Sequence, residues 1–97
     1  MIEIQQESLA DFCRRNHVKK LSLFGSAITD SFNPTSDVDV LVEFEEGHIP
    51  GLALIRMQDE LSQLFKGRQV DLVTPKFLNP RIRQKIESEA VTQYVKG

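Results

Sequence analysis

Two aspartates in the segment Asp37-Val-Asp-Val-Leu-Val42 are the side chains best suited to chemistry in this chain of 97 residues. Side chains alternate across a β-strand, so Asp37 and Asp39 would share one face about 7 Å apart while valines occupy the other. Carboxylates at that separation suit hard cations such as Mg²⁺, which take oxygen ligands and leave positions open for substrate phosphates. The segment therefore predicts a strand with one face for binding and one face for packing.

A third carboxylate occurs in the later segment Val70-Asp-Leu-Val73. Its alternation puts Val70 and Leu72 on the packing side and Asp71 on the side of Asp37 and Asp39, if this strand lies about 4.8 Å from the earlier one. Three anions in one place repel one another unless cations neutralise them, which favours a metal site. The alternative is that each aspartate only keeps an exposed strand face polar.

A glycine-serine pair follows the first strand-like run, Leu21-Ser-Leu-Phe24. A glycine turn that leads into a helix start offers free backbone N–H groups, and the positive end of a helix dipole, to an anion. Gly25 and Ser26 could therefore hold phosphate groups, with the Ser26 hydroxyl adding a hydrogen bond. A plain structural turn is the alternative at this position.

Hydropathy patterns along the chain predict the elements that would carry these residues. Hydrophobic periodicity, with glycine and proline at the breaks, indicates a helix over residues 3–16, a strand over 18–24, a short helical turn over 26–30 and a strand over 37–44. It then indicates a helix over about 54–65 that a glycine ends, a strand over 69–74 and a last helix from Asn79-Pro80 onward. We expect α/β (α+β) architecture in the order α-β-α-β-α-β-α, with a small mixed sheet of three or more strands covered by helices on one side. In the last helix, the expected inward-facing residues are Ile82, Ile86, Ala90, Val91 and Tyr94.

Composition narrows the functional classes. The length predicts one domain over residues 1–97, and 12 basic against 14 acidic side chains give 12 − 14 = −2, so direct nucleic-acid binding is not expected. The single cysteine, Cys13, cannot form an internal disulfide and is expected to be a buried apolar residue. No signal segment or membrane span is evident, so we expect a soluble, cytoplasmic protein.

The combination of Gly25-Ser26, Ser36-Asp37-Val-Asp39-Val-Leu-Val42 and Val70-Asp71-Leu-Val73 resembles the minimal nucleotidyltransferase (MNT) branch of the DNA polymerase beta-like superfamily, from Leu21 to about Tyr94. The resemblance implies the nucleotidyltransferase fold and transfer of a nucleoside monophosphate from a nucleoside triphosphate to an acceptor hydroxyl. It implies that Asp37, Asp39 and Asp71 are the metal ligands for two Mg²⁺ ions and the catalytic residues. It also implies that Gly25, Ser26 and Ser36 bind the nucleotide, expected to be ATP.

The same branch resembles antitoxins that are paired with HEPN-domain toxins. The resemblance therefore implies a Mg²⁺-dependent enzyme that moves AMP to a hydroxyl, a tyrosine, of a HEPN toxin partner in a type VII-like toxin–antitoxin pair. The alternative is a catalytically silent MNT-fold antitoxin, or a binding subunit of a homo- or hetero-oligomer, that covers its partner. Residues Ala27 to Asp30 favour the alternative, because members of the branch commonly have an arginine-containing stretch there.

Some charged residues remain outside this scheme. Arg81, Arg83 and Lys85 begin the predicted last helix, where acidic side chains are preferred, so they are either exposed surface charges or contacts for a partner or nucleotide. His17 and His48 lack the spacing of metal ligands with each other or with Cys13, and no chemistry is assigned to them.

Overall fold

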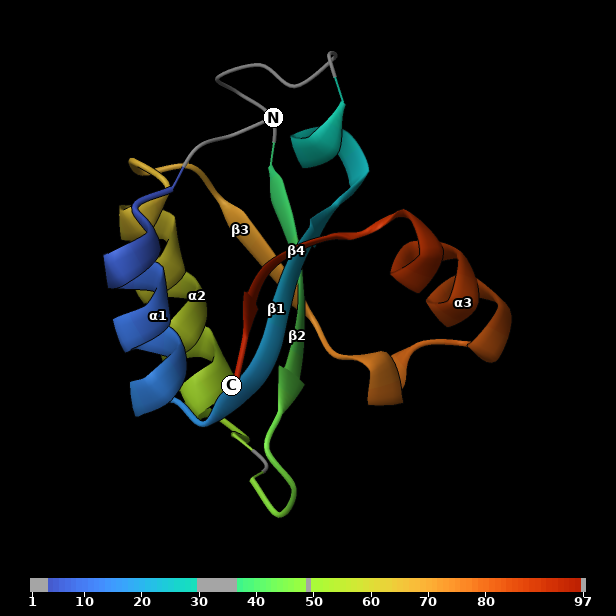
Figure 1. The fold of residues 1–97 in the computed structure, drawn as a ribbon, viewed down its shortest axis with the longest axis horizontal. Helices are drawn as coiled ribbons and strands as arrows, with labels where there is room; N and C mark the ends of the chain where they lie inside the picture. The colour runs from blue at the N-terminus through green and yellow to red at the C-terminus, as the bar shows by residue number, and fades with distance from the viewer. Residues whose placement is uncertain (1–3, 30–36, 49, 97) are drawn as a thin grey trace.

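A four-stranded mixed sheet forms the frame of the computed structural model, which describes residues 4–29, 37–48 and 50–96 (Figure 1). The strands lie in the order β3-β2-β1-β4, with β3 parallel to β2 and the other neighbours antiparallel. The elements are α1 (Gln6–Arg15), β1 (Val18–Phe24), the 3₁₀ turn η1 (Gly25–Ile28), β2 (Val38–Phe44), α2 (Ala53–Leu64), β3 (Val70–Val73), the 3₁₀ turn η2 (Pro75–Phe77), α3 (Pro80–Glu89) and β4 (Val91–Val95). The expected small mixed sheet is confirmed, and Ser36 lies outside the described residues.

Helices α1 and α2 cover one face of the sheet, on the left of Figure 1. Their apolar residues meet the valines of β2 in a core whose members include Phe12, Cys13, Met57 and Leu61. Cys13 is fully buried, and burial raises the pKa of its thiol to about 12, so its expected role as a buried apolar residue is confirmed. Within the described part of the chain, no helix has the length and apolar character needed to cross a membrane.

The end of the chain differs from the prediction. The last helix stops at Glu89, Ala90 takes an extended conformation, and Val91–Val95 forms a strand paired with β1, so the predicted order α-β-α-β-α-β-α is wrong at its end. This segment is rich in β-branched and aromatic residues, and the otherwise open edge of β1 supplies the hydrogen bonds.

The inward face predicted for the last helix is also wrong. No residue of α3 is buried, and Ile82 is 53 % exposed. Val91 is exposed on β4, and Tyr94 packs against the core from the sheet instead of from a helix. Whereas α1 and α2 share one face, α3 stands away from them on the other side of the sheet, which we call the open face (Figure 1).

Candidate active site

Strand register brings the three sequence motifs together at one end of the open face. Asp39 of β2 pairs with Asp71 of β3 in the parallel ladder, and with Phe24 of β1 in the antiparallel ladder. Gly25 directly follows Phe24, so the glycine turn begins beside the strand that carries the aspartates. Residues paired across neighbouring strands lie about 5 Å apart, so Asp71 joins Asp39 as the alternation predicts.

The face of β2 opposite the aspartates is apolar and buried. Val38, Val40 and Val42 are fully buried under the helices, while Asp39 is half-buried and Asp71 is exposed. This division follows from the two-residue period of β-strands, which turns alternate side chains to opposite faces. The predicted assignment of one packing face and one polar face to β2 is confirmed.

Asp39 is the electrostatic centre of the cluster. Its pKa is raised above the usual value, first by burial, then by the charge of Asp71, and then by the charge of Asp37. All three effects disfavour the ionised carboxylate, so its ionisation in the folded protein costs free energy that a bound cation would offset.

Gly25 lies against this carboxylate. Its φ of +67° is in the left-handed region, and a Cβ atom at this position would lie 2.4 Å from Oδ2 of Asp39. The sequence predicts a tight bend or a close ligand approach at Gly25, and the structure adds a close contact with Asp39. The backbone conformation favours glycine, and a Cβ atom here would displace the Asp39 carboxylate.

Ser26 connects the turn to the start of β2, because its hydroxyl donates a hydrogen bond of 3.5 Å to the backbone carbonyl of Asp37. The predicted short helical turn is present as η1 (Gly25–Ile28). Ala27 within it is fully buried in the core. A long cationic side chain would not fit in the space that Ala27 occupies, which gives a packing reason for the absence of arginine at this position.

The carboxylates suit Mg²⁺ by their chemistry, since hard oxygen donors are the ligands this ion prefers. Among the described residues, however, no group of three His, Cys, Asp or Glu side chains is already arranged to hold one ion. Asp37 and Asp71 are near enough to Asp39 for their charges to raise its pKa. Their part in metal binding is therefore taken up as a proposal below.

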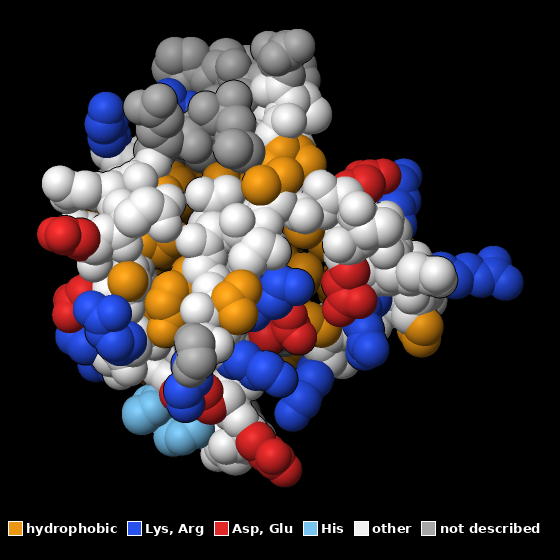
Figure 2. Space-filling view, viewed as in Figure 1, with side chains coloured by type: hydrophobic (Ala, Val, Ile, Leu, Met, Phe, Trp, Pro, Cys, Tyr) orange, Lys and Arg blue, Asp and Glu red, His pale blue; other side chains and the backbone are white. Residues whose placement is uncertain are grey.

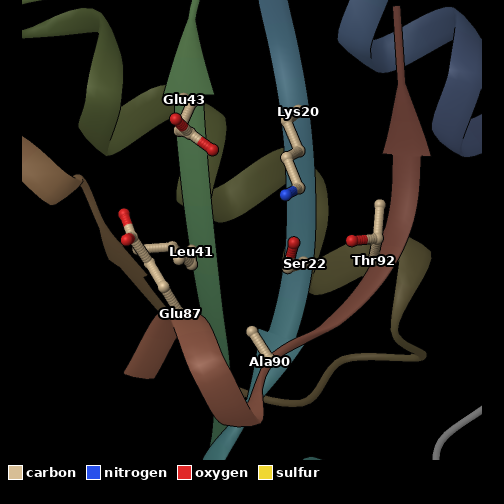
Figure 3. A pocket seen from close by; sticks show the side chains of 7 residues that line it. All are labelled: Lys20, Ser22, Leu41, Glu43, Glu87, Ala90 and Thr92. Carbon is tan, nitrogen blue, oxygen red and sulfur yellow. The ribbon is translucent and has the colours of Figure 1, made fainter. Parts of the chain in front are cut away.

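Sequence reasoning missed a hollow on the same face, lined by Lys20, Ser22, Leu41, Glu43, Glu87, Ala90 and Thr92 (Figure 3). The strand alternation contained a signal for it, because Leu41 and Glu43 follow Asp39 at two-residue steps and Ser22 is paired with Leu41. The position of α3 was the missing information, since the last helix was expected to pack on the core.

The histidines come together without reaching the acidic site. The rings of His17 and His48 stack with centroids 3.9 Å apart, and Nδ1 of His17 lies 3.5 Å from Glu45. Figure 2 shows Lys and Arg side chains interspersed with Asp and Glu on the viewed face, in agreement with the small net charge.

Comparison with known proteins gives the class. The sequence profile of the nucleotidyltransferase domain family matches residues 6–92, which is most of the chain. The chain therefore belongs to the nucleotidyltransferase family, and the predicted enzyme class and fold agree with this result.

Individual relatives narrow the class to its minimal branch. The chain is 39 % identical over 77 residues to a Methanocaldococcus jannaschii protein provisionally assigned as a protein adenylyltransferase, covering 79 % of this chain and 81 % of that protein. A solved structure described as a minimal nucleotidyltransferase superposes with a TM-score of 0.75 at 34 % identity, covering 89 % of this chain and 86 % of that one.

A third similarity concerns the fold. The structure of a tri-AMPylated Shewanella oneidensis HEPN toxin in complex with an MNT antitoxin contains a chain with a TM-score of 0.66 to this one, at 17 % identity. The match covers 94 % of this chain and 70 % of the other. The 39 % identical relative and the 34 % identical solved structure confirm the resemblance to minimal nucleotidyltransferases, and this third match agrees in fold.

Proposed function

We propose that this protein is a Mg²⁺-dependent protein adenylyltransferase that moves AMP from ATP to a tyrosine hydroxyl of a HEPN-domain toxin and thereby acts as its antitoxin. The observation that carries the proposal is Asp39, a half-buried carboxylate whose pKa is raised by burial and by its two acidic neighbours, held against the turn at Gly25. The assigned activity of the archaeal relative and the HEPN complex formed by the structural neighbour support the choice of reaction and partner.

In the proposed reaction, the acceptor oxygen forms a bond to the α-phosphorus of ATP while the bond from that phosphorus to the β-phosphate oxygen breaks. Pyrophosphate leaves, and the acceptor proton passes to a carboxylate oxygen of Asp71. Backbone N–H groups at Gly25 and Ser26 would hold the departing phosphates. Asp37, Asp39 and Asp71 would hold two Mg²⁺ ions, which when bound stabilise the charge on the attacking and leaving oxygens.

A direct test incubates the purified chain with a HEPN-domain protein from the same organism, ATP and Mg²⁺, and measures the intact mass of the HEPN protein. We expect a gain of one AMP per transfer, on a tyrosine located by fragmentation. The matched control is Asp39→Asn, which preserves shape but removes a charged metal ligand and should abolish the gain. An unchanged mass with the unmodified chain would refute the catalytic proposal.

The alternative function, a silent antitoxin that covers its partner, is favoured by one feature of the chain. Within the described residues from Gly25 to Thr29 there is no cationic side chain to bind a triphosphate, and Ala27 is buried. The Asp39→Asn variant separates the two functions. If it still binds the toxin but no longer neutralises it, catalysis is required, whereas unchanged neutralisation supports coverage.

A further inference from the structure

The segment that runs from η2 into α3 carries exposed cationic and apolar side chains side by side in the sequence. Residues 75–86 contain four of the chain's twelve cationic side chains and none of its fourteen acidic ones. Phe77 is 84 % exposed and Ile82 is 53 % exposed, so both leave most of an apolar side chain in water. Together with the exposed residues Lys76, Arg81 and Lys85, they form what we call the α3 patch.

The helical part of the α3 patch faces away from the sheet. Glu87 and Ala90 line the hollow between α3 and the sheet, so they mark the inner side of the helix (Figure 3). With about 3.6 residues per turn, Arg81 and Lys85 lie one turn apart on the outer side, and Ile82 lies beside them. Figure 2 shows Lys and Arg side chains that project from the region of α3 next to a hydrophobic side chain. The patch is therefore accessible to a partner.

The cations of the patch are not neutralised by the part of the chain that the structure describes. The ion pairs found there include none of Lys76, Arg81 and Lys85, whereas Arg83, on the inner side, lies 3.6 Å from Glu87. Arg81 is in the first turn of α3, where the helix dipole favours acidic side chains. Its charge therefore opposes the dipole, and carboxylates of a partner would offset this cost.

Helix α3 also lacks the packing that normally stabilises a short helix. It has 10 residues, and none of them is buried. Isolated helices shorter than about 12–15 residues are marginal in water, because most helical stability in proteins comes from packing of an apolar face. The N–H of Arg81 donates a hydrogen bond of 2.9 Å to Oδ1 of Asn79, which supports only the first turn. A partner that covers Ile82 would supply the missing packing.

The composition of the patch favours a protein over a nucleic acid as this partner. Aromatic and arginine side chains such as Phe77 and Arg81 are enriched in protein interfaces, and an aliphatic side chain such as Ile82 gains nothing from a phosphate backbone. The net charge of the chain is −2, so its overall field does not attract a long polyanion. The surface that fits the patch is an acidic protein surface with an apolar depression.

The position of the patch suits a partner that is also the acceptor. Helix α3 follows β3, which carries Asp71, and leads into Val91 of β4. Val91 is paired with Leu23, two residues before the turn at Gly25, so α3 borders the open face on which the proposed reaction takes place. A standard protein interface covers about 800 Å² per partner and is thus roughly 30 Å across, whereas 10 helical residues span about 15 Å. A protein seated on the patch would therefore reach the open face as well.

We propose that the α3 patch is the docking surface for the acceptor protein, and that an acidic surface of that protein receives Phe77 and Ile82 in an apolar depression. This inference rests on the proposed function for the identity of the partner, a HEPN-domain protein. Of the two possibilities for Arg81 and Lys85, exposed surface charges or contacts, it selects contacts with a protein partner.

The test measures the affinity of the chain for a HEPN-domain protein from the same organism, by calorimetric titration without ATP or Mg²⁺, so that no AMP is transferred. The variant Phe77→Ser/Ile82→Ser removes the apolar part of the patch, and Arg81→Glu/Lys85→Glu reverses its charge. Because acidic side chains are favoured near a helix N-terminus, Arg81→Glu should not weaken α3. Circular dichroism checks the fold of each variant.

Matched controls make the same changes outside the patch. Leu52, the N-cap of α2, and Ile55, in its first turn, are each slightly more exposed than Phe77 and Ile82, so Leu52→Ser/Ile55→Ser removes similar apolar surface. The variant Arg14→Glu/Arg56→Glu changes the net charge equally, at two exposed positions on α1 and α2. These controls separate a local contact from a general effect of hydropathy or charge.

We expect each patch variant to lose about tenfold or more in affinity for the HEPN protein, and each control to stay within about twofold of the unmodified chain. The affinity of the unmodified chain should fall as salt rises, and that of the charge-reversed patch variant should fall much less.

Equal affinities in the patch variants and the controls would overturn the inference. Binding of a single-stranded RNA by the unmodified chain that both patch variants lose would also overturn it. The mass gain of the HEPN protein is measured separately, so either result leaves the proposed function standing. If the unmodified chain does not bind the HEPN protein, the proposed partner fails first and this inference fails with it.

Discussion

Replacing Gly25 by alanine tests whether the glycine turn and Asp39 form one unit. At φ +67°, an L-residue with a Cβ atom is strained by roughly 1–2 kcal/mol. The added methyl group would also lie 2.4 Å from Oδ2 of Asp39, which is too close for any real contact, so the carboxylate must move. We therefore expect Gly25→Ala to lose more stability than the backbone strain alone accounts for, and to lose Mg²⁺-dependent ATP binding.

Two other glycines provide the matched controls. Gly47 and Gly67 have φ values of +84° and +85°, and a Cβ atom at either would meet nothing within 4 Å. Their alanine variants measure the cost of the left-handed conformation without a collision.

Urea unfolding gives the free energy of unfolding of all three variants, and calorimetry gives their ATP affinity. In a domain of this size each kcal/mol corresponds to about 4–8 °C in Tm, so the difference is easily measured. Equal stability losses in Gly25→Ala and Gly67→Ala, with ATP binding retained by both, would refute the proposed contact between the turn and Asp39.

Three further predictions concern the carboxylate cluster, the core and the last strand. Because the pKa of Asp39 is raised in the folded state, the metal-free protein should lose stability as pH rises from the unfolded pKa of 3.8 through the folded pKa, and Asp39→Asn should reduce this loss. Urea unfolding midpoints measured against pH in EDTA test this expectation. An identical pH profile in the variant would contradict it. The Cys13 thiol, buried and with its pKa raised to about 12, should react with a disulfide reagent only after unfolding, so rapid native labelling would rule out its buried position. Tyr94→Ala should lower the free energy of unfolding by about 1–3 kcal/mol, because Tyr94 packs on the core from β4. Val95→Ala, at a position 58 % exposed, should change it by about 0.5 kcal/mol or less. Equal effects of the two variants in urea unfolding would argue against the placement of Tyr94 on β4.

Local pattern accounts for most of the fold that could be predicted from the sequence. The strand that ends at Gly25 and the alternation around Asp39 were predicted correctly because they depend on neighbouring residues, as does the helical period through Met57 and Leu61. The same alternation put Asp39 and Asp71 on one face before any strand order was known. The roles of Asp37, Asp39, Asp71, Gly25, Ser26 and Ser36 in metal and nucleotide binding remain predictions.

Tertiary structure decided the features that depend on contacts between distant segments. The parallel register of Asp39 with Asp71, the approach of the Gly25 backbone to the Asp39 carboxylate, and the hollow beside Leu41 each join elements that local periodicity cannot place relative to one another. The pairing of Val91–Val95 with β1 shows the reason most clearly. From local sequence the segment was predicted to continue the last helix, but in the structure it forms a strand that hydrogen-bonds to the edge of β1. The sequence by itself determined which residue types could do chemistry and which face they share, and long-range strand pairing decided how they meet.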